Sequence, residues 1–468
     1  MQLALLLILF ILFALLAWHN LKMALILLSG LLPAYLLRLS FGPIPSTALE
    51  IMILICVVVW MIKLIWPNAH IPYFDAPLPH LGTPFSHLNT LFSHPDTPFS
   101  HPDDRRDLLA WIYPTVLLLI ASIIGIIVAP DTLSAIGIWK AYFIEPILVA
   151  VMMLSTFNKK DWTLCLQALS FTAITLSLFA IFQYLTGVGI PIPWDIELRA
   201  TSVFDYPNAL GLFLAPIVTF NIIKLALSPF QRGRGLAVPK LQSSEGRRGS
   251  SWISILTIIL GLIAIILSQT EAALVAIPVA VIITLLISKI SKKKKLVLLI
   301  LSVLLVLFSL LVPTVREKLL LQDYSGQVRL SQWSETLELA KDHPFFGAGL
   351  NGYPTALGPY HNSTLYEIFQ YPHNIFLNIW SELGILGLIA LFWFAYLIIK
   401  RLVSPPFKGG VGGGRYYSAQ LTIFSALLTI FIHGLVDVPY FKNDLSILTW
   451  ILLAGLVAIQ LNKKPKTN

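Results

Sequence analysis

Charged side chains are scarce in this chain of 468 residues. Only 12% of its residues are Asp, Glu, Lys or Arg, about half the share usual in a soluble globular domain. Hydrophobic residues instead make up 57%, and the mean hydropathy is +0.80. Many separate stretches reach the ~20 apolar residues that a helix needs to cross a bilayer. The composition excludes an ordinary soluble domain and predicts an all-α polytopic membrane protein.

Cysteine is scarce as well. The two cysteines, Cys56 and Cys165, both lie inside apolar stretches, which excludes a disulfide framework and a cysteine-based metal site. The N-terminal stretch MQLALLLILFILFALLAW lacks the basic residues and the small-residue cleavage site of a signal peptide. We therefore expect it to remain as a helix.

The apolar stretches predict about 12–13 transmembrane helices. The candidate spans are residues 2–18, 21–38, 47–65, 108–129, 138–157, 162–186, 207–227, 252–268, 271–288, 296–313, 375–399, 419–436 and 445–461. A long, partly helical extracytoplasmic loop is expected before the eleventh span.

The net charge of +9 comes from basic loops between these spans. Residues 228–250, 288–295 and 400–415 and the C-terminal tail fall on one side when the spans alternate, and the positive-inside rule makes that side cytoplasmic. The opposite side then receives residues 187–206 and 314–374. The basic balance is thus a topology signal, and no nucleic-acid partner is expected.

Five regions follow along the chain. They are N-terminal transmembrane helices (1–66), a low-complexity cytoplasmic loop rich in His and Pro (67–107), central transmembrane helices (108–313), the extracytoplasmic loop (314–374), and C-terminal transmembrane helices with a basic tail (375–468). The low-complexity loop contains a seven-residue repeat that places His80, His87, His94 and His101 in register. A metal site is one interpretation, but proline recurs through the repeat and no cysteine completes a site, which favours a solvated loop.

The loop 314–374 contains an amphipathic helix over residues 325–344. We expect Ser325 to cap it and Pro344 to end it. Its buried stripe is predicted to consist of Val328, Trp333, Leu337 and Ala340. The following GAGLNG (347–352) has the spacing of a dinucleotide fingerprint but lacks the preceding strand, so a tight turn is expected.

Polar residues gather where these loops meet the membrane. His373 and Asn374 stand at the start of the eleventh span, a helix N-terminus suited to an anion, and imidazole suits proton transfer. A histidine that merely caps the helix is an equal interpretation. Arg199 and Arg329 each lie in an outer loop, and arginine is suited to forked binding of phosphate oxygens.

These segments resemble the superfamily of O-antigen ligases and Wzy-type O-antigen polymerases. The resemblance rests on RLSQWSETLELAKDHPFFGAG (329–349), YPHNIFLNIWSELGILGL (371–388) and RATSVFDYPNALGLFL (199–214). It implies a glycosyltransferase that takes a glycan from a polyprenyl diphosphate, typically undecaprenyl diphosphate. The acceptor is a hydroxyl group on a lipid, a glycan or a protein, and the site faces outward from the bacterial cytoplasmic membrane. Ligase and polymerase are not distinguished.

The resemblance also implies roles for individual residues. Arg199 and Arg329 match the diphosphate-binding arginines, and His373 matches the histidine that activates or positions the acceptor hydroxyl. Further substrate-binding candidates are Asn374, His361, Glu367, Asn208 and Trp333. Among these, we expect the two asparagines to be helix caps first and the tryptophan to serve packing first. No metal site and no cofactor are expected.

A transporter of a small anion such as bicarbonate is the competing interpretation. Glu145 and Glu271 lie in or near spans, where ionisable residues are usually functional, although Lys140 offers a structural partner for Glu145. Against a transporter, the polar groups gather at the outer mouth and no pair of broken helices marks a midplane site.

Overall fold

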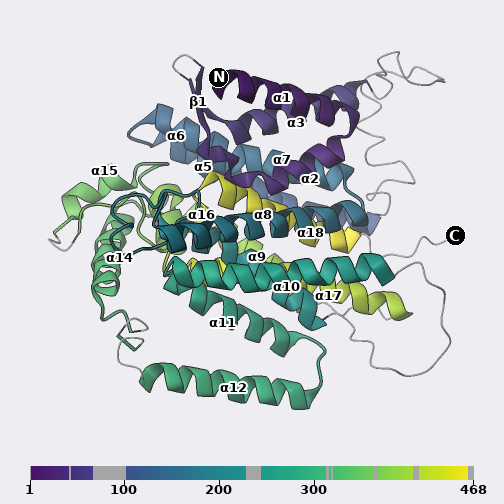
Figure 1. Ribbon diagram of the computed structural model, residues 1–468. Coiled ribbons are helices and arrows are strands. Elements are labelled where there is room, and N and C mark those ends of the chain that lie inside the picture. The colour runs from purple at the N-terminus through teal and green to yellow at the C-terminus, as the bar shows by residue number, and fades with distance from the viewer. Residues whose placement is uncertain are drawn as a thin grey trace.

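The computed structural model describes residues 2–41, 44–66, 102–227, 244–311, 316–317, 320–362, 366–403 and 410–461. The seven-residue repeat, most of the basic loop 228–250, much of 400–415 and the C-terminal tail lie outside these residues. Within the described residues the protein is a bundle of helices, most of which run side by side (Figure 1).

The elements of the N-terminal half are α1 (Gln2–His19), α2 (Leu21–Gly30), η1 (Leu32–Leu36), β1 (Arg38–Phe41), β2 (Ile44–Thr47), α3 (Ala48–Ile65), α5 (Pro102–Ile127), α6 (Thr132–Trp139), η2 (Lys140–Ile144), α7 (Glu145–Thr156), α8 (Lys159–Thr186) and α9 (Pro207–Leu227). The C-terminal half comprises α10 (Ser244–Leu267), α11 (Glu271–Ile287), α12 (Lys292–Leu311), α14 (Tyr324–Asp342), α15 (Tyr353–Leu357), η3 (Gly358–Tyr360), α16 (Ile375–Val403), α17 (Gly410–His433) and α18 (Asn443–Leu461).

The all-α polytopic membrane fold is confirmed. Within the described residues, six helices are long and apolar enough to cross a membrane, and six further apolar helices are 10–17 residues long. One predicted span, 21–38, is wrong in its second half. There α2 ends at Gly30, and the chain continues through η1 into a hairpin in which β1 pairs antiparallel with β2. Pro33, which lacks a backbone N–H, explains why α2 does not continue.

Local sequence signals set the ends of several helices. Thr47 and Glu50 form a reciprocal capping box at the start of α3, and Asn158 and Asp161 do the same for α8. At its other end α8 terminates at Gly187, whose φ of 70° is the left-handed conformation that glycine adopts at little cost.

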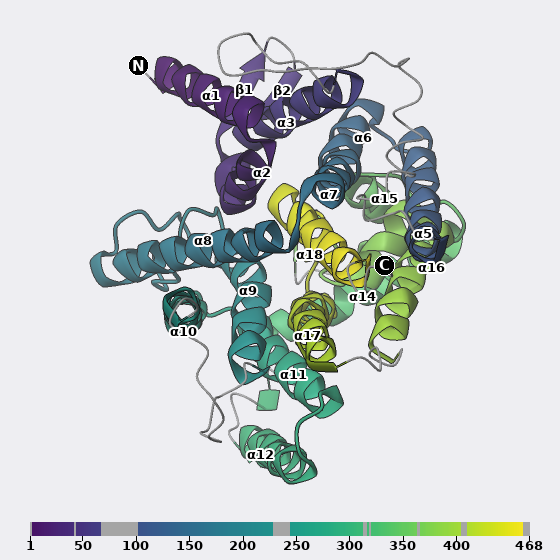
Figure 2. The same cartoon turned by 90° about the vertical axis from the view of Figure 1, so that its right-hand side faces the viewer.

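Helix α9 occupies the middle of the bundle, where it packs against α8, α10, α11 and α17 (Figure 2). The helix therefore has buried side chains on all of its faces. Polar side chains in this region bond to each other, as when Thr429 of α17 donates to Thr219 of α9 at 2.9 Å. Helix α18 is also interior, between α7 and α17, whereas α12 lies at an edge beside α11.

Lys140, the expected structural partner of Glu145, pairs with another carboxylate in the structure. It forms an ion pair with Glu50 of α3, in which the two charged atoms lie 3.0 Å apart. Lys140 begins the π-helical turn η2, and Glu145 directly follows that turn in a buried position. Ser46 also donates to Glu50, at 2.9 Å, so the Glu50 carboxylate joins the hairpin, α3 and η2.

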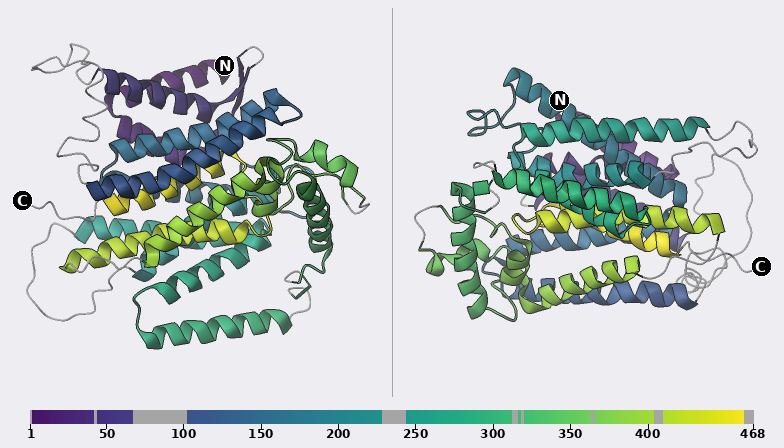
Figure 3. Two further views of the ribbon diagram at one scale, coloured as in Figure 1. Left: turned by 180° about the vertical axis from the view of Figure 1, so that it is seen from behind. Right: turned by 90° about the horizontal axis from the view of Figure 1, so that it is seen from below.

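Helix α14 runs across the ends of the membrane helices (Figure 3). Its predicted position is confirmed, but two details are wrong. Asp323 caps the helix by accepting from the Gly326 N–H at 3.1 Å, a role assigned to Ser325. Leu337 and Trp333 are not on the buried side, which is formed instead by Gly326, Val328, Gln332, Glu335, Thr336, Leu339 and Ala340. The reason is that α14 packs on the polar segment before α16, whose backbone groups form hydrogen bonds with Gln332 and Glu335.

The glycine-rich turn after α14 fits into a break in α16. Gly384 interrupts the helix with φ 64° and ψ −162°. Peptide groups beside the break form hydrogen bonds with the turn. The Ala348 N–H donates to the Ser381 carbonyl at 2.6 Å, and the Ile385 N–H donates to the Pro344 carbonyl at 3.0 Å. Gly347 and Gly349 also have positive φ. The turn predicted for GAGLNG is confirmed, and its glycines allow backbone to approach backbone.

We predict that Gly384→Ala destabilises the protein. An added Cβ collides with the Phe345 carbonyl oxygen, and an L-residue at positive φ costs about 1–2 kcal/mol by itself. Thermal unfolding of the detergent-solubilised protein should show a clearly lower midpoint. Gly137→Ala is the matched control, because a Cβ there meets nothing within 4 Å. Equal midpoints for the two variants would contradict this account of the break.

Candidate functional site

The connection between α17 and α18, residues 434–442, brings together elements that are distant in the sequence. The Gly434 carbonyl accepts from Ile375 N–H at 2.8 Å, and the Leu435 carbonyl accepts from the Asn374 side chain at 2.9 Å. The Val436 carbonyl accepts from Arg329 Nε at 3.1 Å. The start of α16 and the N-terminal part of α14 are thus fixed to one short segment.

His373 occupies an unusual backbone conformation beside that connection. Its φ is 48°, in the left-handed region that is costly for a non-glycine residue. Its ring nitrogen Nδ1 lies 3.4 Å from Asp437 Oδ1, and its side chain is 30% exposed. Asn374, directly after it, caps α16 by accepting from the N–H groups of Phe376 and Leu377. The backbone strain places the imidazole against Asp437 instead of along the helix.

Asp437 is ionised throughout the ordinary pH range. Burial by itself raises the pKa of this carboxyl group. The hydrogen bond and charge of His373, the charge of His433 and the Val438 N–H outweigh burial and lower the pKa to about 2. A carboxylate that binds Nδ1–H orients the ring and leaves Nε2 as the proton acceptor. Asp437 was not predicted from the sequence.

The two candidate arginines are anchored in similar ways. Arg329 donates through Nε to Val436 and through Nη1 to the Ser325 hydroxyl at 2.7 Å. Arg199 donates through Nε to the Ser268 carbonyl at 3.2 Å and through Nη2 to Asn208 at 3.3 Å. A guanidinium has five N–H donors. In each arginine some of these donors fix the group to the protein, and the remaining donors can bind an anion.

The loop that carries Arg199 contacts the same connection farther along the chain. The Arg199 guanidinium lies 5.0 Å from the ring centre of Trp194. Further along this loop, the rings of Phe204 and Tyr206 lie 4.4 and 5.2 Å from the ammonium nitrogen of Lys442, the last residue of the connection. The structure therefore brings Arg329 and His373 to one segment and joins the Arg199 loop to its far end. Convergence of all three side chains on one cavity stays a prediction.

The remaining candidates divide into anchoring residues and one exposed residue. Asn208 holds Arg199 rather than capping a helix, whereas Asn374 is the cap that was expected. Trp333 is half-buried, and its indole N–H donates to the Pro372 carbonyl at 2.8 Å. Glu367 is exposed.

His361 belongs to a tightly bonded cluster around Glu335. Its Nδ1 lies 2.9 Å from the Glu335 carboxylate, and its Nε2 lies 3.1 Å from the Tyr366 carbonyl. Both ring nitrogens are therefore engaged, and neither is open to a substrate. Glu335 also accepts from the Tyr366 hydroxyl at 2.5 Å and from the Asn362 N–H at 3.1 Å. The cluster fixes the segment that leads to His373.

Glu382 is a buried carboxylate that the sequence interpretation missed. It is fully buried in α16, where neither carboxylate oxygen makes a hydrogen bond of normal geometry with the described residues. Asn378, one turn earlier, is buried in the same way. The available signal was the spacing of Asn374, Asn378 and Glu382 at every fourth residue, which places them on one face of a helix.

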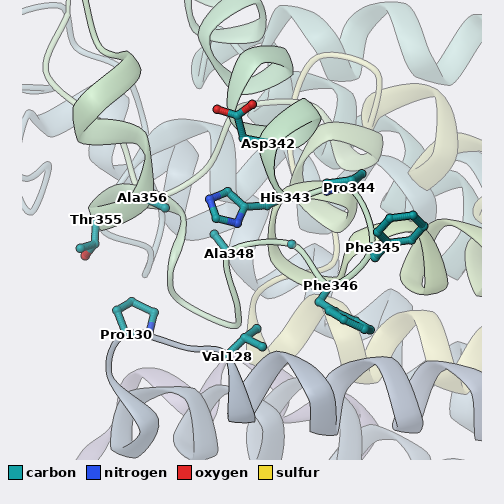
Figure 4. Close-up of a pocket in the computed structure, with 11 residues that line it drawn as sticks. Val128, Pro130, Asp342, His343, Pro344, Phe345, Phe346, Ala348, Thr355 and Ala356 are labelled. Atoms are coloured by element: carbon teal, nitrogen blue, oxygen red, sulfur yellow. The ribbon is translucent and has the colours of Figure 1, made fainter.

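A cavity of about 500 Å³ lies at the other end of α14 (Figure 4). Asp342, His343 and Phe346 line one side, and Pro130 and Thr355 face them. Its lining includes none of the three principal candidates, Arg199, Arg329 and His373. The cavity is thus separate from the residues gathered at the α17–α18 connection.

Comparison with known families finds a match in the C-terminal half of the chain. Residues 256–392 match a family model described as O-antigen ligase. The matched segment contains Arg329 and His373, and it excludes Arg199 and Asp437. It supports the resemblance seen in the sequence, and with it an O-antigen ligase-type membrane enzyme. A search of curated proteins gave no match.

We predict that the segment leading to His373 loosens in acid. Burial by itself raises the pKa of Glu335, but the hydrogen bonds from Tyr366, His361 and the Asn362 N–H lower it below its usual 4.5. A carboxyl group with a lowered folded-state pKa stabilises the fold above its unfolded pKa, and this stabilisation is lost as the pH falls. Hydrogen-exchange protection of residues 366–374, corrected for intrinsic rates, should decrease as the pH falls below about 4.5.

Glu335→Gln is the control for this experiment. The variant should show reduced protection of the same segment at neutral pH and little further change in acid. Undiminished protection of the unsubstituted protein down to pH 3 would contradict the proposed role of Glu335.

Proposed function

From the O-antigen ligase match over residues 256–392, we propose that this protein is a membrane glycosyltransferase. It transfers a glycan from undecaprenyl diphosphate, or a similar polyprenyl diphosphate, to a hydroxyl group on a lipid, glycan or protein. The reaction serves the synthesis of cell-surface polysaccharide. One observation carries the proposal: His373 is strained into contact with an ionised Asp437 on the connection that also anchors Arg329.

The arginines are proposed to bind the diphosphate of the donor. When the bond between the sugar and the diphosphate breaks, negative charge develops on the leaving group. Guanidinium groups fixed beforehand by backbone carbonyls stabilise that charge without reorganising. In Arg329 the Val436 carbonyl and Ser325 supply this fixation, and in Arg199 it is supplied by Ser268 and Asn208. A divalent metal ion is not required by this arrangement.

His373 is proposed to act as the general base. Asp437 holds Nδ1–H, so Nε2 takes the proton from the acceptor hydroxyl. The acceptor oxygen forms a bond to the anomeric carbon of the donor sugar while the bond from that carbon to the diphosphate oxygen breaks. Polyprenyl diphosphate leaves, and the proton on His373 passes to solvent through the exposed part of the ring.

We predict that His373→Asn lowers the transfer rate by about 10²–10⁴-fold, the usual contribution of a general base. Asparagine tolerates the left-handed backbone at this position, so loss of rate reports on the imidazole and not on misfolding. Arg329→Lys should also impair transfer, because lysine keeps the charge but lacks the planar fork. The measurement is transfer from a purified polyprenyl-linked glycan to acceptor in the presence of EDTA.

Two variants serve as matched controls for these substitutions. His343→Asn alters an exposed histidine that lines the separate cavity, and Arg401→Lys alters an arginine in the last turn of α16. Both should transfer at rates close to that of the unsubstituted protein. The mechanism is wrong if His373→Asn and Arg329→Lys match these controls, and added Mg²⁺ restoring an EDTA-sensitive rate would contradict metal independence.

We also propose that the α14 side of the bundle faces outward from the bacterial cytoplasmic membrane. Both natural cysteines are buried, so single cysteines can be introduced at exposed positions. In intact cells, an impermeant thiol reagent should label Lys341→Cys in α14 and should not label Lys160→Cys at the start of α8. The reverse labelling pattern would contradict this orientation.

A further inference from the structure

A row of aromatic rings leads from the Glu335 cluster to His373. Tyr366 and Phe369 are stacked, with ring centres 5.7 Å apart and planes inclined by 11°. Phe369 in turn meets the His373 ring edge to face at 5.4 Å. The partly exposed Phe369 ring is therefore directly beside the group proposed to take the acceptor proton.

The row is held at both ends by α14. On one side, Glu335 accepts the Tyr366 hydroxyl hydrogen bond at 2.5 Å. On the other side, Gln332 donates to the Tyr371 carbonyl at 2.7 Å, and Trp333 donates to the Pro372 carbonyl at 2.8 Å. Phe369 lies between these fixed points, so its ring is ordered before any ligand arrives. Such preorganisation reduces the entropy that binding costs.

Burial distinguishes the two stacked rings. Tyr366 is buried, with 9% exposure, whereas 41% of Phe369 remains exposed. The Phe369 ring rests on a fixed neighbour and offers apolar surface beside His373.

We propose that Phe369, supported by Tyr366, is a stacking platform for a sugar ring at the transfer site. One face of a pyranose carries several polarised C–H groups, and these pack favourably on the electron-rich face of an aromatic ring. The adjacent His373 then meets a hydroxyl of the sugar that is stacked. The inference rests on the proposed glycosyltransferase function and adds a specificity-determining residue to it. The sugar belongs either to the acceptor or to the first unit of the donor glycan.

The test is a kinetic comparison of Phe369→Leu, Phe369→Tyr and the unsubstituted protein. Leucine keeps apolar bulk but removes the flat ring, whereas tyrosine retains it. Transfer should be measured with purified polyprenyl-linked glycan and acceptor, each titrated separately. We expect Phe369→Leu to raise KM about 3- to 10-fold for the substrate whose sugar stacks, and Phe369→Tyr to restore it. A raised KM for the acceptor alone assigns the platform to the acceptor, and a raised KM for the donor alone assigns it to the donor.

A binding measurement separates the sugar from its lipid carrier. Bare undecaprenyl diphosphate and the glycan-bearing form should be titrated against the same variants in detergent. If the donor sugar stacks, Phe369→Leu weakens binding of the glycan-bearing lipid and leaves binding of the bare lipid unchanged. Phe345→Leu is the matched control, because Phe345 is an even more exposed phenylalanine of the same loop that lines the separate cavity.

Several outcomes overturn the platform. One is an unchanged KM for both substrates in Phe369→Leu, as expected if the ring only contacts lipid headgroups. Another is a lower kcat with a shifted pH profile and unchanged KM values, which means that Phe369 only orients His373. Failure of the proposed function looks different, because the unsubstituted protein then transfers no glycan or His373→Asn retains full activity.

Discussion

A helix that ends near a membrane boundary leaves carbonyl groups without partners inside the helix, and each unsatisfied group is costly. The last carbonyls of α17 accept from the backbone N–H groups of Gly434, Leu435 and Val436, which form the turn after the helix. The carbonyls of these three turn residues find donors in the α16 backbone, in Asn374 and in Arg329. The turn that terminates α17 therefore also fixes an arginine and the start of another helix, and assembly of the candidate site depends on it.

This arrangement explains how the protein holds a strained residue. A non-glycine residue in the left-handed region costs about 1–3 kcal/mol and persists only where its surroundings enforce it. For His373 those surroundings are the Pro372 carbonyl bonded to Trp333, the capping bonds of Asn374, and Asp437 beside the ring. The protein itself thus fixes the charged and aromatic groups, which suits the proposed stabilisation of a transition state by fixed groups.

Much of the architecture was predictable because membrane helices need long apolar runs, and those runs are visible in the sequence. The end of α2 was missed because the apolar pattern continues past Pro33. The buried face of α14 was predicted wrongly for another reason: its partner is a polar segment, so Gln332 and Glu335 are buried through hydrogen bonds that periodicity does not reveal. Asp437 was missed because no local pattern connects it with a histidine 64 positions earlier.

The long segment from α14 to α16 is connected by hydrogen bonds at two places, at the break in α16 and beside His373. Helix α14 leads into the glycine-rich turn, the turn fills the break at Gly384 in α16, and the start of α16 carries His373. Trp333 then connects the residue before His373 back to α14. Because these elements are bonded to one another, a displacement at the break is transmitted to His373 by two routes, through the first part of α16 and through α14.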